Sequence, residues 1–218
     1  MAFASQSDRD RTAHGLQAGV SRKLSEWLEI RAGFGIDGRT YLEGRDDFGL
    51  ARDNLSAYPL VAAAYASDEV NIAAAYSPVW RIFEDPTFDD VLAHVFSLQA
   101  TWRPAPSVQL LAGASSGLQE TDFLISRTIV ARVFSAGAVF TAEDGSNLQL
   151  EGIYTREEHK GLKRIDDKIE LRLAGRARVS GPLFLTFELS YLGFKSSFGD
   201  VGTEEFAGGL GLAYAFPG

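Results

Sequence analysis

The sequence contains no cysteine, which excludes disulfides, zinc–thiolate sites and thiol catalysis. Histidine and proline are scarce, with three and seven residues in a chain of 218. Long hydrophobic runs are also missing, since no window approaches the roughly 18 uncharged apolar residues of a membrane helix. Basic residues are outnumbered, and the formal net charge is -8. These deficits exclude a helical membrane protein and argue against a nucleic-acid partner, which would attract a basic surface.

What the sequence does contain is a hydrophobic period of two. Residues 165–181, IDDKIELRLAGRARVSG, place apolar or small residues at almost all odd positions, and mainly charged ones at even positions. This alternation is typical of a β-strand with one apolar and one polar face. The stretch alone does not decide which face is inside. In a soluble protein the charged face would point outward to water, whereas in a lipid-embedded barrel the apolar face points outward to lipid.

Eleven such runs divide the chain, and most are as long as the 9–11 residues of a tilted membrane-spanning strand. The chain therefore reads as one repeated strand–turn unit, a single domain over residues 1–218. The predicted strands are Gly15–Leu24, Trp27–Tyr41, Leu55–Ser67, Val70–Phe83, Val91–Arg103, Val108–Gly117, Phe123–Glu143, Leu148–Arg156, Ile165–Ser180, Leu183–Phe194 and Glu205–Phe216.

The connections between these runs alternate in length. Tight turns such as DGSN at 144–147 and GP at 181–182 alternate with long, mostly acidic segments. The long segments are LEGRDDFGLARDN, EDPTFDD, LQETD, EEHKGLK and SSFGDVGTE. Short periplasmic turns and longer external loops are typical of outer-membrane barrels, although a soluble antiparallel meander could vary in the same way.

The two faces also differ in their small and aromatic residues. The polar face includes Gly33, Gly35, Ala73, Ala75, Gly113 and Gly211, which would leave space inside a closed barrel. The apolar face carries aromatics near several strand ends, as interfacial girdles do: Tyr65, Trp80, Trp102, Phe140, Tyr191, Tyr214 and Phe216. The pattern therefore favours an apolar face toward lipid, with core aromatics of a soluble barrel as the alternative.

The last strand, GGLGLAYAF, alternates Leu210, Leu212, Tyr214 and Phe216 close to the chain end. It resembles the C-terminal signal by which the assembly machinery recognises bacterial outer-membrane β-barrel proteins. The resemblance covers the strand–turn organisation of nearly the whole chain and is specific to this broad class. It implies a transmembrane antiparallel up-and-down β-barrel in the outer membrane, with the bilayer and the assembly machinery as partners.

That class has an even strand number with both termini in the periplasm. The run at Gly15–Leu24 precedes a short turn, so an ascending strand should come before it. Ala2–Ser7 could supply this strand, with the AspArgAspArg segment as its loop. We therefore expect twelve strands, with ten or fourteen as alternatives; the chain could also be the barrel part of a longer protein.

The polar face carries charges of both signs that should point into the lumen. They could line a water-filled pore whose arginines favour anionic solutes, or form ion pairs that plug it. The predicted lumen residues are Glu29, Arg31, Asp37, Arg39, Arg81, Arg103, Glu151, Asp166, Lys168, Glu170, Arg172, Arg176, Arg178 and Glu188.

Nothing in the sequence predicts catalysis. His14, His94 and His159 have no evident serine partner, and no metal-ligand spacing or phosphate-binding glycine loop is present. Paired acids such as Asp46-Asp47 fall in loops, where solvation is the simplest explanation. We expect no enzyme, no cofactor and no metal.

Pro59 and Pro78 fall inside predicted strands, where proline cannot donate a ladder hydrogen bond. A turn centred on Asp68-Glu69 would place them opposite each other. The pair could weaken the wall and open a lateral route for apolar molecules, or lie above the bilayer where a bulge is tolerated.

The sequence thus predicts an outer-membrane barrel acting as a narrow passive channel for small hydrophilic solutes, anions being favoured by its arginines. The alternatives are a non-conducting barrel with an anchoring or interaction role, involving an unknown periplasmic or surface partner, and a translocation barrel fused to a removed periplasmic region for polymer or lipoprotein export.

Overall fold

A computed structural model describes residues 11–42, 44–45, 49–120, 128–199 and 201–214. Each of the eleven predicted runs corresponds to one strand. No described segment forms a helix long and apolar enough to cross a bilayer. The strands are β1 (Arg11–Lys23), β2 (Leu28–Tyr41), β3 (Asn54–Ala66), β4 (Val70–Phe83), β5 (Val91–Ala105), β6 (Val108–Glu120), β7 (Thr128–Thr141), β8 (Asn147–His159), β9 (Arg164–Ser180), β10 (Leu183–Ser196) and β11 (Gly202–Tyr214).

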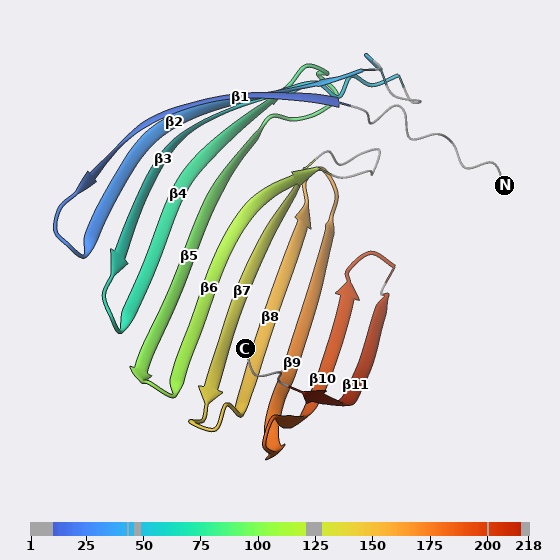
Figure 1. Ribbon diagram of the computed structural model, residues 1–218. Helices are drawn as coiled ribbons and strands as arrows, with labels where there is room; N and C mark the ends of the chain where they lie inside the picture. The colour runs from blue at the N-terminus through green and yellow to red at the C-terminus, as the bar shows by residue number, and fades with distance from the viewer. Residues whose placement is uncertain (1–10, 43, 46–48, 121–127, 200, 215–218) are drawn as a thin grey trace.

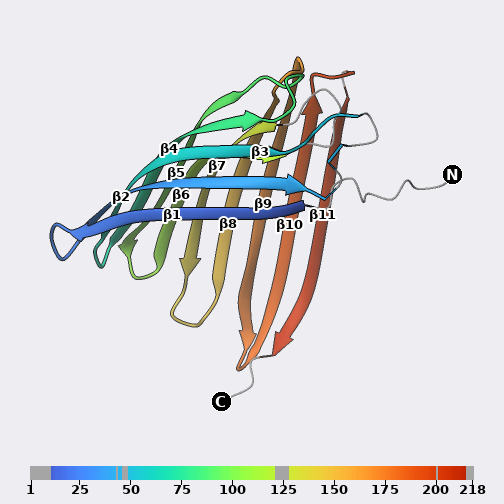
Figure 2. The same ribbon diagram turned by 90° about the horizontal axis from the view of Figure 1, so that it is seen from above.

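The strands form one antiparallel meander in which every strand pairs with its neighbours in the chain. Figures 1 and 2 show them in chain order around a strongly curved sheet. Because all ten pairings are antiparallel, the odd-numbered strands, β1 and β11 included, run in the same direction. Antiparallel closure of a barrel would therefore need one more ascending strand. The strand predicted at Ala2–Ser7, which would be the twelfth, lies outside the described residues.

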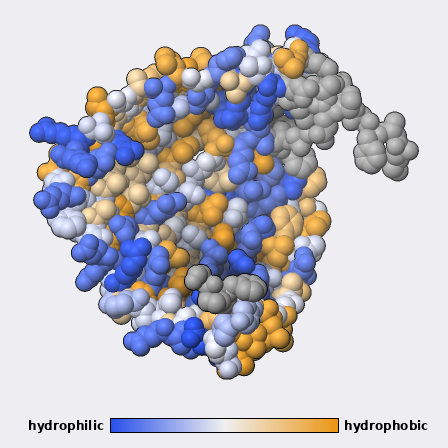
Figure 3. All heavy atoms as spheres, viewed as in Figure 1, coloured by the Kyte–Doolittle hydropathy of each residue, from blue (hydrophilic) through white to orange (hydrophobic). Residues whose placement is uncertain are grey.

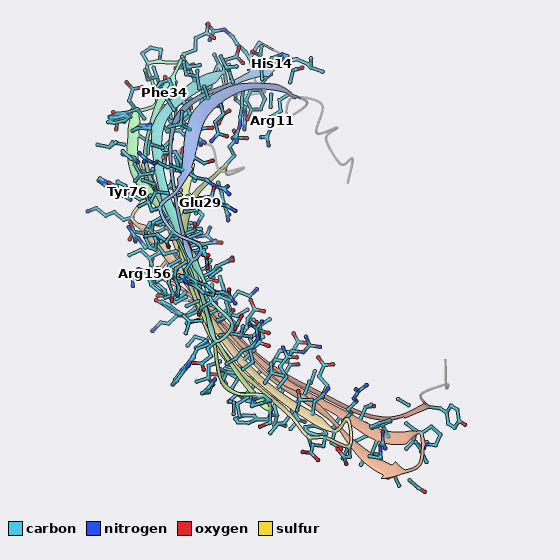
Figure 4. All side chains as sticks on the ribbon, turned by 60° about the vertical axis from the view of Figure 1, so that its left-hand side comes forward. Arg11, His14, Glu29, Phe34, Tyr76 and Arg156 are labelled. Carbon is cyan, nitrogen blue, oxygen red and sulfur yellow. The ribbon has the colours of Figure 1, made fainter. Side chains whose placement is uncertain are left out.

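The apolar parity lies on the outside of the curve. Side chains of the two parities emerge on opposite faces, and Figure 4 shows Phe34, Tyr76 and Arg156 on the convex side, with Arg11 and Glu29 in the concavity. Many large outward apolar residues have little protein cover, and Leu210 is 81% exposed. A sheet that leaves its apolar face exposed and turns its charges inward matches a lipid-embedded wall rather than a soluble one.

Aromatic residues mark the turn side of this outward face. Tyr65, Trp102, Phe140 and Tyr214 lie at or near the turn ends of β3, β5, β7 and β11 and are 41–55% exposed. Trp80 lies toward the loop side of β4. Phe216, the last of the predicted girdle and of the C-terminal pattern, lies outside the described residues.

Three predicted loops are wrong at their edges because the strands extend into them. Arg11 is the first residue of β1, Leu118–Glu120 end β6, and Glu157–His159 end β8. Ladder hydrogen bonds join backbone groups, so pairing continues into polar sequence where the apolar alternation stops. The β8–β9 connection thereby shrinks to residues 160–163, and the length contrast with the turns is lost there.

The sheet splits at the loop ends of β5 and β6. These strands pair from the turn up to Phe96 and Ser116, whereas β5 begins at Val91 and β6 continues to Glu120 without pairing to each other. Figure 1 shows β5 and β6 diverging over this part. Five of the buried apolar residues lie on the strands that flank the split, with Val79 and Ala93 on β4 and β5, and Ile129–Ala131 on β7.

Candidate pore-lining site

The inward charges predicted from the sequence all share the concave face. The register links them from strand to strand; Arg31, for example, lies in the same inward row as Lys168. Figure 3 looks onto this hollowed face, over which hydrophilic residues are spread. Two groups of charges on this face have different surroundings, one on the loop side of β1–β6 and one on β8–β10.

The loop-side group, here called the arginine cluster, consists of Arg11, Arg39, Arg81, Tyr41 and Glu120. Arg11 and Arg39 form ion pairs with Glu120. The Tyr41 hydroxyl donates a hydrogen bond to Glu120 Oε2 over 2.8 Å. Since Glu120 ends β6, these contacts join β1 and β2 to a strand that is not their neighbour in the sheet.

Arg81 is the most buried arginine of the cluster, only 5% exposed. Its Nε donates to Ser56 Oγ over 3.2 Å, but its Nη1 is buried without a hydrogen-bond partner among the described residues. Arg39 and Arg11 are close enough to act on its charge. A buried guanidinium nitrogen without an acceptor, beside two more cations, is suited to bind an anion.

The split between β5 and β6 explains how Glu120 reaches the cluster. Ser116, on β6, is buried although its side chain has outward parity. Val79 and Ala93, on β4 and β5, face inward and are buried as well. Burial of both sets is consistent with the loop end of β6 lying under the concave face of β4 and β5. We call this end of β6, Gly117–Glu120, the wedge; it narrows the concavity on the loop side.

The second group, here called the charge ladder, consists of Lys168, Glu170, Arg172 and Glu188. Arg172 Nε and Glu188 Oε1 are 2.8 Å apart, as part of an ion pair between β9 and β10. Lys168 Nζ and Glu170 Oε1 are 2.7 Å apart on β9. Arg172 and Glu188 are half exposed, at 52% and 51%. The ladder thus holds balanced charges that are open to solvent.

The other predicted lumen residues lie toward the turn side or beside the ladder. Arg176 and Arg178 are both within 5.2 Å of the Phe184 ring, and Arg176 donates to the Gly145 carbonyl. Arg31 pairs with Glu29 over 2.8 Å. Glu151 lies opposite Arg172, and Arg103 is near the β5–β6 turn.

Small inward residues leave space beside the charges, as expected. Ala62, Ala64, Ala73 and Ala75 help to line a hollow of about 360 Å³ on the concave face of β3–β5. Gly35 has a different role, because the Tyr58 ring lies over it: a Cβ at residue 35 would be 2.4 Å from Tyr58 Cζ.

One histidine cluster lies on the inward face at the loop ends of β8–β10, and its hydrogen bonds differ from those of a serine–histidine–aspartate triad. Asp166 lies between its partners, with Ser196 Oγ 2.5 Å from Oδ1 and His159 Nε2 3.2 Å from Oδ2. His159 therefore does not serve as the base for Ser196. Glu157, His159 and Asp166 bring ligand atoms within 4.8 Å, yet the Arg164 guanidinium is 2.6 Å from Asp166 and already balances its charge.

The two prolines lie opposite each other within a break in the β3–β4 ladder. Pairing is regular up to Ala57–Trp80 and resumes in the same register at Val61–Tyr76. Ser77 Oγ donates to the Pro59 carbonyl over 2.7 Å and replaces one lost bond. Ser77 and Val79 are buried, so the inner side of this seam is covered.

Sequence reasoning missed Arg11, Tyr41 and Glu120. Arg11 and Glu120 were assigned to loops, and Tyr41 was only the end of a run. Inward parity on β1 and β2 could have indicated Arg11 and Tyr41. Glu120 has the opposite parity, so only the split of the sheet brings it inward.

Known proteins point to the same architecture. A family model described as "Putative beta-barrel porin 2" matches residues 2–216. Three solved structures of OmpT, an outer membrane protein of Vibrio cholerae, share the fold: the in-vitro folded protein (TM-score 0.54, 11% identity), its trimer form (0.53, 10%) and a loop L8 deletion mutant (0.51, 11%). The matches cover 95% of this chain and 80%, 85% and 87% of those chains. No curated protein matches the sequence.

Proposed function

Because the chain belongs to this β-barrel porin family of the bacterial outer membrane, we propose that it is a narrow passive channel for small hydrophilic anions. The family supports a porin-like barrel, and the choice of solute rests on the concave face. The observation that carries it is the buried Arg81, whose Nη1 lacks an acceptor among the described residues while Arg11 and Arg39 lie nearby.

The charge balance of the arginine cluster favours anions. Three guanidinium groups face two carboxylates, Asp37 and Glu120, and the Glu120 side chain is only 17% exposed. Rings of arginine in a constricted pore attract anions and repel cations, and low local dielectric strengthens the effect. The charge ladder adds no such preference, because its acids and bases are equal in number.

A passive channel also fits the residues better than an enzyme does. The wedge would narrow the path on the loop side, and the small residues of β3 and β4 would leave water-filled space below it. In the group formed by Ser196, His159 and Asp166, the serine hydroxyl donates to the carboxylate and not to the histidine, unlike the arrangement of a catalytic triad.

Bilayer recordings test the proposal. Purified protein in a planar bilayer should give small single-channel steps, and a potassium chloride gradient should give a reversal potential of the sign for anion selectivity. The variant R39Q/R81Q should lose most of that preference. The control R31Q/R176Q removes the same charge from concave positions outside the cluster and should keep it.

The two parts of the proposal fail differently. Absence of any current from folded protein would contradict a channel and favour a non-conducting barrel. Cation selectivity, or an equal effect of both double variants, would contradict the role of the arginine cluster.

A further inference from the structure

A second charged group lies on the outward face, where the wall should contact lipid. Register pairs join Arg132 to Arg156, Arg156 to Asp167, and Asp167 to Lys195. These four residues, here called the outer charged row, cross β7, β8, β9 and β10 side by side. Figure 4 shows Arg156 on the convex side, together with Phe34 and Tyr76.

The row lies directly above an apolar stretch. The outward residues next to it on the turn side include Phe134 and Tyr154, whose rings stack at 6.3 Å, and the half-exposed Ile169. From Leu148 to Arg156, β8 rises roughly 20 Å along the axis of a tilted barrel, close to the ~25 Å apolar band of such proteins. The row is therefore at the loop-side edge of that band, level with the lipid headgroups of the outer leaflet.

The contacts within the group leave positive charge in excess. Arg132 pairs with Glu158, and Lys160 Nζ is 3.5 Å from Glu158 Oε2. Arg156 Nη1 is 3.8 Å from Asp167 Oδ1, which also accepts a 2.6 Å hydrogen bond from the Tyr154 hydroxyl. Lys195 adds a further cation opposite Asp167. Four cations thus face two carboxylates, in a chain whose net charge is -8.

This cation excess is confined to one side of the wall. On the loop-side halves of β1–β5, the outward strand positions in the described chain carry no lysine or arginine. An interfacial preference of the whole barrel would spread basic residues around it. Their concentration over four neighbouring strands indicates one site for one anionic group.

We propose that the outer charged row, with Lys160, binds the phosphorylated headgroup of an outer-leaflet lipid. Arginine guanidinium groups match phosphate oxygens in bidentate geometry, and lysine adds a point charge. The aromatic and aliphatic residues below the row would contact the acyl chains of the same lipid. The tyrosine hydroxyl and the two carboxylates hold Arg132, Arg156 and Lys160 in place, and the side chains of these three cations stay 36–44% exposed.

Lipid retention tests the site. The protein is reconstituted in phosphatidylcholine vesicles with or without lipopolysaccharide and re-extracted in neutral detergent, and native mass spectrometry counts the lipids retained. The wild type should retain lipopolysaccharide. The variant R156Q/K195Q should bind it about thirtyfold more weakly, at about a fivefold loss per cation near a charged surface.

A matched control separates the site from net charge. R22Q/R172Q removes two cations, one outward at the turn end and one inward, and should retain lipopolysaccharide like the wild type. R156K/K195R, which keeps both charges, should recover most of the binding and shows whether a loss reflects misfolding. Equal retention by R156Q/K195Q and the wild type would overturn the proposal.

Two further arms identify the source of the phosphate. Inorganic pyrophosphate added to protein in phosphatidylcholine vesicles should leave its thermal unfolding midpoint unchanged, whereas lipopolysaccharide should raise it. An equal rise with pyrophosphate would assign the site to a free anion and overturn a lipid site. Equal retention of phosphatidylglycerol would indicate bulk surface charge and would overturn it as well.

Discussion

The arginine cluster and the charge ladder lie on the same concave face, but they differ in how far their charges are buried and in which strands their ion pairs join. In the cluster, Arg81 is buried and Glu120 joins strands that are not neighbours. In the ladder, Arg172 and Glu188 pair across adjacent strands and stay half exposed. A buried charge without a counter-charge or hydrogen-bond partner destabilises the fold, whereas exposed ion pairs contribute little to stability. In the proposed channel, the arginine cluster would therefore determine anion selectivity, and the charge ladder would form a hydrated part of the pore wall.

Neutralising Glu120 should have the largest effect. E120Q removes the carboxylate shared by Arg11 and Arg39, and because Glu120 is only 17% exposed, we expect the free energy of unfolding to fall by about 2 kcal/mol. Anion selectivity should increase, since three cations remain. Urea unfolding in vesicles and reversal potentials measure the two effects. E188Q, the same change in the ladder, should leave both nearly unaltered; equal effects would erase the distinction.

Gly35 tests packing on the cluster side. A Cβ at residue 35 would lie 2.4 Å from the Tyr58 ring, so G35A should displace that ring and cost about 2 kcal/mol of unfolding free energy. On β11, an added Cβ at Gly209 meets nothing within 4 Å, so G209A should cost far less. Urea unfolding compares the two variants, and a larger loss for G209A would contradict the assignment.

The proline seam should exchange hydrogen faster than the ladder side. Ser77 replaces one bond around Pro59 and Pro78, whereas β9 and β10 pair without a gap from Phe184 to Ser196. We expect S77A to lower the local opening free energy by about 1 kcal/mol, a roughly fivefold increase in exchange at Leu60 and Val79. Hydrogen exchange in detergent measures it. Slow amide hydrogen exchange along the whole β3–β4 seam would contradict a lateral route for apolar molecules.

Acid should loosen the loops on the cluster side. Hydrogen bonds from the side chain and backbone of Thr87, with the Ala51 N–H, hold the pKa of Asp85 below its ordinary value. This carboxylate joins the β2–β3 and β4–β5 loops. Its stabilisation is complete above the unfolded pKa of about 3.9 and is lost as pH falls through the lower folded pKa.

Exchange of the loop amides at pH values below about 4 measures this effect, and D85N should show it already at neutral pH. Asp144 is the control, because the Ser146 backbone N–H also lowers its pKa but within one turn of β7–β8. D144N should leave the β2–β3 loop unchanged. An identical response of that loop to both variants would contradict a specific anchor.

Most of the fold could be predicted because its signal is local. A period of two identifies each strand from its own residues, and every predicted run became one strand. The errors at Arg11, Glu120 and His159 share a cause: strand pairing continues by backbone hydrogen bonds after the side-chain alternation ends. The opposition of Pro59 and Pro78 was also predictable, since a tight turn sets the register of its hairpin.

The sequence by itself determined which residues face inward and which face lipid, because alternation along a strand is independent of the rest of the chain. Only the tertiary structure decided which charges meet. The split between β5 and β6 carries Glu120 to Arg39, which is 81 residues away, and strand register aligns Arg132, Arg156, Asp167 and Lys195. Contacts of this kind depend on the curvature and stagger of the whole sheet, which no single strand encodes.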